Sequence, residues 1–114
     1  MESILTSIKK LLGISEDYDH FDPDIIMHVN TVFMDLKQVG VGPSTGFRIE
    51  DDTAVWTDFV GDSIDFEAIK TYIYLKVKLV FDPPLSSSVQ AAMERTANEL
   101  LWRLNVAAES TDVE

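Results

Sequence analysis

The sequence predicts a mainly all-α protein, a four-helix bundle-like domain with a small irregular or β-hairpin insertion between the second and third helices. Three observations support this fold class. Apolar residues recur at helical spacing in four separate segments. The most hydrophobic of these segments is far longer than an ordinary strand. Glycine and proline residues stand where the segments stop, as they commonly do where helices end.

The chain has 114 residues, of which 46% are hydrophobic, and this size suits one domain with one core. It has no cysteine, so a disulfide framework and thiolate chemistry are excluded. We expect no signal peptide and no contact with a membrane, because no apolar run reaches about 18 residues. The predicted domain covers residues 1–104, and residues 105–114 are expected to form a flexible acidic tail.

The first predicted helix spans residues 3–12, with apolar residues at positions i, i+1, i+4, i+7 and i+8. Gly13 follows as a C′ residue. An acidic loop then leads to the second helix, for which Asp22 is the expected N-cap and Pro23 suits the first helical position. Gly40 ends this helix. Its apolar stripe consists of Ile25, Val29, Val32, Phe33 and Leu36.

The insertion follows at residues 40–62, and its first seven residues hold three glycines and a proline, which predicts a loop. Residues 47–56 read as two very short strands around an acidic turn and are a candidate hairpin. The stretch "WTDFVGD" is compatible with one helical turn. Its Trp56 and Phe59 stand in polar surroundings, either as a mini-core that pins the insertion or as interface anchors, and the mini-core is favoured.

The segment at residues 66–81 carries two competing patterns. Read as a strand, its alternate residues share an apolar face, whereas a helix that begins near Asp65 has an apolar stripe along one side. Length favours the helix, because ordinary strands have about five or six residues. The prolines at 83 and 84 favour it too, because a residue before proline avoids the α region. The stripe consists of Phe66, Ile69, Ile73, Val77 and Val80.

The fourth helix begins after Pro84, where any of the three serines at 86–88 can cap it. Its apolar positions continue at helical spacing to Leu104. Trp102 lies near the end of this helix and joins the two aromatic residues of the insertion as an interface candidate. The candidate interface residues are Trp56, Phe59 and Trp102.

The chemistry-bearing residues match no catalytic, cofactor or metal signature. A calcium loop of the EF-hand type beginning at Asp17 needs glycine at its sixth position and glutamate at its twelfth, and these positions hold Asp22 and His28. The histidines form no HExxH pattern, and the glycine-rich loop lacks the GK[ST] ending of a phosphate loop. We therefore predict that the protein is not an enzyme and has no catalytic, cofactor-binding or metal-binding residues.

The charge balance restricts the partners. Twenty acidic residues stand against nine basic ones, and the net charge is −11. Such a surface repels phosphate backbones, so we expect no sequence-specific binding of nucleic acid. A protein past which nucleic acid slides without adhering stays compatible with this charge.

Three stretches carry a family resemblance: "LGI" at 12–14, "FDPDII" at 21–26 and "KLVFDPP" at 78–84. With "WTDF" between them, the region from residue 4 to residue 104 resembles the small head–tail connector (adaptor) proteins of long-tailed bacteriophages and prophages. The resemblance implies a small helical bundle without enzymatic activity or cofactor.

The resemblance also implies a structural virion protein that joins the portal to the tail and extends the DNA channel. About a dozen copies would form a ring in the neck of the virion, assembled in the bacterial host cytoplasm, with the portal protein and neck or tail-completion proteins as partners. The insertion would form one face of each subunit, and residues 105–114 would order on docking to the portal. The alternative is an acidic DNA mimic or inhibitor that binds a basic partner. Its acids would follow one face, whereas here they cluster in loops and at helix starts.

Overall fold

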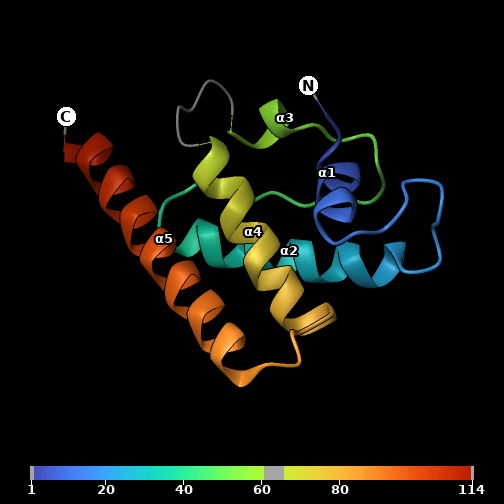
Figure 1. Cartoon of the computed structure of the whole chain (residues 1–114). Helices are drawn as coiled ribbons and strands as arrows, with labels where there is room; N and C mark the ends of the chain where they lie inside the picture. Colours follow the sequence, from blue (N-terminus) through green and yellow to red (C-terminus); the bar gives the residue numbers. More distant parts are fainter. Residues whose placement is uncertain (1, 61–65, 114) are drawn as a thin grey trace.

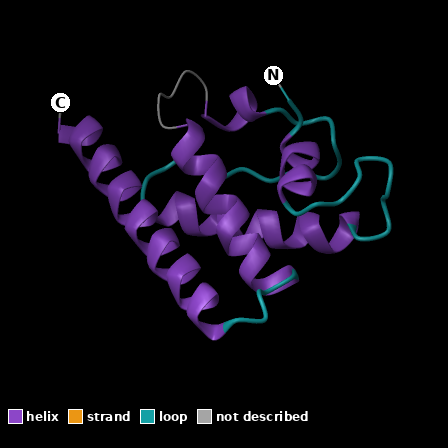
Figure 2. Cartoon of the chain, viewed as in Figure 1, coloured by secondary structure: helices purple, strands orange, loops and turns teal. Residues whose placement is uncertain are grey.

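The computed structural model describes residues 2–60 and 66–113, with side chains as far as Glu109. Helices joined by loops make up these ranges, which contain no strand (Figures 1 and 2). The mainly all-α fold class is therefore confirmed, and the short α3 is the helical turn expected in the insertion. The helices are α1 (Ile4–Leu11), α2 (Asp22–Gln38), α3 (Trp56–Val60), α4 (Phe66–Phe81) and α5 (Ser87–Val113).

Helix α4 is the centre of the fold. It crosses α2 and packs along α5, so it contacts the two other long helices (Figure 1). The helix buries the stripe Ile69, Ile73 and Val77, while Tyr72 and Leu75 widen the buried face. Burial over this wide face offsets the low helix propensity of its β-branched residues. The helical interpretation of residues 66–81 is confirmed, although the expected start near Asp65 lies outside the described residues.

The junction between α1 and α2 departs from the prediction at one residue. Helix α2 begins at Asp22 itself, after Phe21, and no side chain caps it. The carboxylate of Asp22 lies 3.0 Å from Nζ of Lys9, which also donates to the backbone carbonyl of Glu16 at 3.1 Å. Lys9 is only 2% exposed, so its ammonium group holds the loop against α1. The predicted N-cap role of Asp22 is wrong because this buried cation takes the carboxylate.

Of the two forms that the sequence left open for the insertion, the hairpin at residues 47–56 is not the one observed. Ile49 faces a side chain and not a strand: its backbone N–H donates to Oδ1 of Asn30 at 2.8 Å, and its carbonyl accepts from Nδ2 of Asn30 at 2.9 Å. The amide of Asn30 therefore satisfies both backbone groups that a neighbouring strand would have paired. Ile49 itself is buried, which fixes this part of the insertion on α2.

The second half of the expected hairpin pairs with the start of the chain. The backbone N–H of Ile4 donates to the carbonyl of Ala54 at 3.0 Å, and Ser3 and Val55 form an isolated antiparallel bridge. The two halves are thus held by different elements. The irregular form of the insertion, which the sequence left open, is the one observed.

Trp56 and Phe59 lie in the core of the chain. Trp56 is fully buried, and its indole Nε1 donates to Oγ of Ser7 at 2.9 Å. Phe59 packs against Phe33 and Phe47, with ring centroids 4.6 and 5.2 Å away. The structure therefore agrees with the favoured interpretation, in which these aromatics pin the insertion to the helices.

Helix α5 is longer than expected. It begins at Ser87, and Oγ of Ser86 accepts the N–H of Val89 at 3.3 Å, so a serine of the 86–88 run acts as the cap. The helix continues to Val113, beyond the predicted boundary at residue 104. The flexibility expected of residues 105–114 stays a prediction, and residue 114 lies outside the described residues.

Candidate assembly surfaces

The described residues bring together no reactive set of side chains. They contain no group of three or more histidine, aspartate or glutamate residues that could hold a metal ion. Among the helices of residues 2–60 and 66–113, none is both long and apolar enough to cross a bilayer. The features that stand out are surfaces: two hollows, an acidic loop and an exposed helix face.

The first hollow lies between the C-terminal half of α2 and the loop at residues 45–48, and we call it the cationic hollow. Its volume is about 460 Å³, and its floor includes Phe33 and Phe47, whose rings meet edge to face at 5.1 Å. Lys37 and Arg48 are exposed at its rim. Its lining residues are Asn30, Phe33, Met34, Lys37, Thr45, Gly46, Phe47 and Arg48.

The rim cations of the cationic hollow form no ion pair with the residues that the structure describes. Lys37 and Arg48 have no carboxylate of these residues within 4.0 Å. The same holds for Lys70, Lys76 and Arg95, whereas the other four basic residues each have a carboxylate partner. Two unpaired cations beside an apolar floor favour an occupant that is both apolar and negatively charged.

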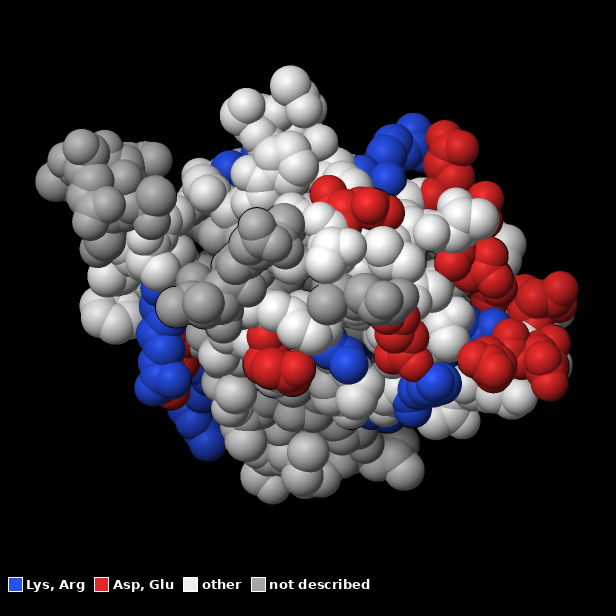
Figure 3. Space-filling model, turned by 90° about the horizontal axis from the view of Figure 1, so that it is seen from above, with Lys and Arg blue, Asp and Glu red and all other residues white. Residues whose placement is uncertain are grey.

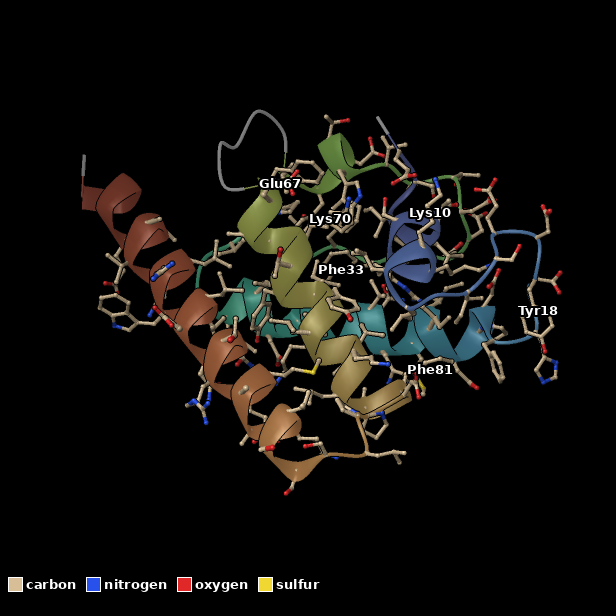
Figure 4. All side chains as sticks on the ribbon, viewed as in Figure 1. Lys10, Tyr18, Phe33, Glu67, Lys70 and Phe81 are labelled. Carbon is tan, nitrogen blue, oxygen red and sulfur yellow. The ribbon has the colours of Figure 1, made fainter. Side chains whose placement is uncertain are left out.

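The second surface is the acidic loop, defined as residues 15–20 between α1 and α2. Tyr18 is 49% exposed at its tip, and its ring leans on His20 and Phe21 at centroid distances of 6.0 and 5.7 Å. Figure 4 shows Tyr18 at the tip of this loop, pointing away from the body of the molecule. Glu16, Asp17 and Asp19 are exposed around it.

Acidic side chains gather on one side of the molecule. Figure 3 shows them toward the right-hand edge, the side on which Figure 1 places the loop between α1 and α2. Nearby carboxylates are held in the charged form. The hydrogen bond from Lys10 lowers the pKa of Glu2, and the hydroxyl and backbone N–H of Thr53 lower the pKa of Asp51. These hydrogen bonds therefore favour the charged forms of Glu2 and Asp51.

The third surface is the outer face of α5, defined by Arg95, Trp102 and Val106. Trp102 is 66% exposed and Val106 is exposed beside it, one turn further along. Leu104, two residues after Trp102, is buried, and two residues turn a helix by about 200°. Trp102 thus points away from the core, and it is the one predicted interface residue that the fold leaves on the surface.

A second hollow, of about 580 Å³, lies where the loop after α1 meets the start of α2 and the end of α4. Met27 and Val80 are exposed there, and Asp24 and Asp82 form an acidic rim. Its lining residues are Leu12, Ile14, Phe21, Asp24, Met27, His28, Val80, Phe81 and Asp82. It offers apolar surface with the opposite sign of charge from the cationic hollow.

The three predicted interface residues therefore separate. Trp56 and Phe59 are buried and offer no surface in the isolated chain, whereas Trp102 does. The sequence reasoning missed both hollows, although one signal was available. Met27 and Met34 lie outside the apolar stripe of the second helix, and each of them lines one of the hollows.

The described residues thus form a small helical domain whose prominent surface features are two hollows, an acidic loop and one exposed helix face. The chain matches the model of a family described as phage connector protein over residues 4–111. It therefore belongs to the phage connector protein family, and the resemblance to head–tail connectors of bacteriophages is confirmed. A search of curated proteins and a search of solved structures return no significant match. Its connector role is structural.

Proposed function

We propose that this connector joins the portal to the tail in the neck of the virion and extends the DNA channel as a ring of about a dozen copies. The observation that carries the proposal is the outer face of α5. As far as Glu109, where the described side chains end, this helix buries only Ala97 and Leu104, and the large aromatic Trp102 stays in solvent. Exposed aromatic anchors of this kind are enriched in protein interfaces.

The partners in this proposal are the portal protein and the neck or tail-completion proteins. Helix α5 supplies the docking arm for the portal. Residues 105–114 bind the portal during assembly in the host cytoplasm. The net charge of −11 supports a position around DNA, because like charge keeps the passing phosphate backbone from adhering.

The test removes the chain from a producing phage or prophage and restores it with variants. Without the chain, DNA-filled heads without tails should accumulate, and the wild-type chain should be a component of purified tailed particles. Tailed particles that form without the chain would contradict the proposal. A basic enzyme captured from host extract in a salt-sensitive complex would instead favour the acidic DNA mimic.

A matched pair of variants tests the docking arm. Trp102→Ala should lower the yield of tailed particles, because it removes the aromatic anchor from α5. Leu85→Ala removes a fully exposed apolar side chain from the loop before α5 and should leave the yield unchanged. Equal yields from both variants would remove Trp102 from the interface.

A further inference from the structure

We propose that copies of this chain associate head to tail, with Tyr18 of one copy inserted into the cationic hollow of the next. This inference rests on the proposed ring and names the two faces that would build it. The acidic loop supplies the inserted aromatic residue, and the pair Lys37 and Arg48 supplies the opposite charge.

The two surfaces complement each other in both polarity and charge. Tyr18 is an exposed aromatic residue among three exposed carboxylates, and the hollow has an aromatic floor and two exposed cations that pair with no carboxylate of the described residues. Burial of the ring supplies apolar contact, and the flanking charges steer and orient the encounter. Tyrosine and arginine are among the residues that interfaces favour.

Both surfaces are held in place before contact. The Asn30 side chain fixes Ile49, the residue that follows Arg48, through two hydrogen bonds. The acidic loop is fixed by the buried Lys9, which contacts both Glu16 and Asp22. Surfaces that are already ordered lose little conformational entropy on binding, so less of the contact free energy is spent on ordering them.

The positions of the surfaces require a second copy. The acidic loop precedes the first turn of α2, and Lys37 lies in its last turn. Fifteen residues of helix separate Asp22 from Lys37, or about 20 Å. Figure 4 shows Tyr18 at the loop tip, well away from Phe33 in the body of the molecule. Tyr18 therefore cannot reach the hollow of its own chain.

A contact between two different faces repeats from copy to copy. Each subunit uses the acidic loop on one side and the cationic hollow on the other, so the contact is heterologous. Such contacts form closed rings when the rotation between subunits closes, and open filaments when it does not. The pairing therefore supplies the kind of contact that the proposed connector ring needs.

The chain contains no cysteine, so single cysteines can report which residues meet. His20→Cys places a thiol beside Tyr18, and Thr45→Cys places one in the lining of the hollow. Both variants keep the proposed contacts of Tyr18, Lys37 and Arg48. The two proteins are mixed at about 1 mM, a concentration at which a weak complex is populated, and treated with a short bismaleimide.

Cross-linked dimer should form in the mixture and not from either variant alone. Thr96→Cys is the matched control, because Thr96 is an exposed threonine on α5 outside the hollow. The yield from His20→Cys with Thr45→Cys should exceed the yield with Thr96→Cys about tenfold, as expected for a local contact over random collision. Similar yields, or no cross-link between positions 20 and 45, overturn the inference.

Charge reversal gives an independent test. Combining Lys37→Glu with Arg48→Glu should abolish the cross-link, and adding Asp17→Lys and Asp19→Lys in the other partner should restore it. All four residues are exposed, and circular dichroism checks that each variant keeps its helices. Failure of the restoring pair, with both proteins folded, overturns the inference. If Tyr18 does not pair with the cationic hollow but the protein is still found in the neck of purified particles, only this inference is overturned and the proposed function stands. If the protein is absent from purified particles, the proposed function itself is overturned.

Discussion

Replacing Gly42 with alanine tests how closely the insertion loop is packed on the core. Gly42 has a φ of +89°, in the left-handed region, and a Cβ at this position would lie 2.8 Å from Cζ of Phe59 and closer still to Cε1. The ring of Phe59 cannot easily retreat, because it is 4% exposed and packs against Phe33 and Phe47. Alanine therefore meets both backbone strain and a steric clash.

The two penalties can be separated with a second glycine. A residue with a side chain costs about 1–2 kcal/mol in the left-handed region, and overpacking a core costs about 1–3 kcal/mol more. Gly42→Ala should then lower the free energy of unfolding by about 2–5 kcal/mol. Gly13 has a similar φ of +81° but nothing within 4 Å of its Cβ position, so Gly13→Ala should cost only the strain, about 1–2 kcal/mol.

Urea denaturation, followed by circular dichroism, measures both variants against the wild type. The midpoint of Gly42→Ala should fall clearly below that of Gly13→Ala, with similar slopes. If the two variants lose the same stability, the Phe59 ring does not press on the loop, and the account of the insertion as part of the core is refuted.

Three further measurements probe the rest of the molecule. Trp102→Phe should leave the blue-shifted fluorescence of the buried Trp56, whereas Trp56→Phe should leave red-shifted emission; identical spectra would contradict the assigned burial. Lys9→Met should lower the free energy of unfolding by about 2–3 kcal/mol in denaturant titrations, because Asp22 loses its cation. A loss below about 0.5 kcal/mol, the level of a neutral surface change, would contradict a stabilising role for the contact between Lys9 and Asp22. Burial raises the pKa of Tyr72 from 10.0 to about 12, so the unfolded chain releases that proton first. Stability should be intact below pH 10 and fall by about 2–3 kcal/mol toward pH 12, and Tyr72→Phe should lose less over that window; equal losses would argue against this burial effect.

The helices could be predicted because each is fixed by local signals. The segment at residues 66–81 alternates like a strand, yet its length and the prolines after it point to a helix, and the structure agrees. The sequence predicts an end for helix α5 that is too early, because the apolar spacing becomes weak after Leu104. Its last turns lie near the loop after α2, where a Cβ on Gly40 would be 3.2 Å from that of Ala108, and small residues at such a close approach leave no apolar signal.

The insertion could not be predicted because its backbone is satisfied by distant groups. Residues 47–49 and 54–55 alternate as strands do, and each pairs elsewhere: Ile49 with the Asn30 side chain and Ala54 with the backbone of Ile4. Nothing in the sequence near 47–56 marks these distant partners. The same holds for the cationic hollow. Arg48 lies beside the helix that carries Lys37 because the neighbouring Ile49 is hydrogen-bonded to Asn30 of that helix.

The stretch from Glu50 to Thr53 is held independently at both ends, by Asn30 before it and by Ile4 after it, and all four of its residues are exposed. The hydrogen bonds that anchor it are made by Ile49 and Ala54, so a change within the stretch leaves these hydrogen bonds in place. This short stretch is therefore a suitable site for inserting a peptide tag or a fluorescent label, with which single copies could be located in assembled neck particles.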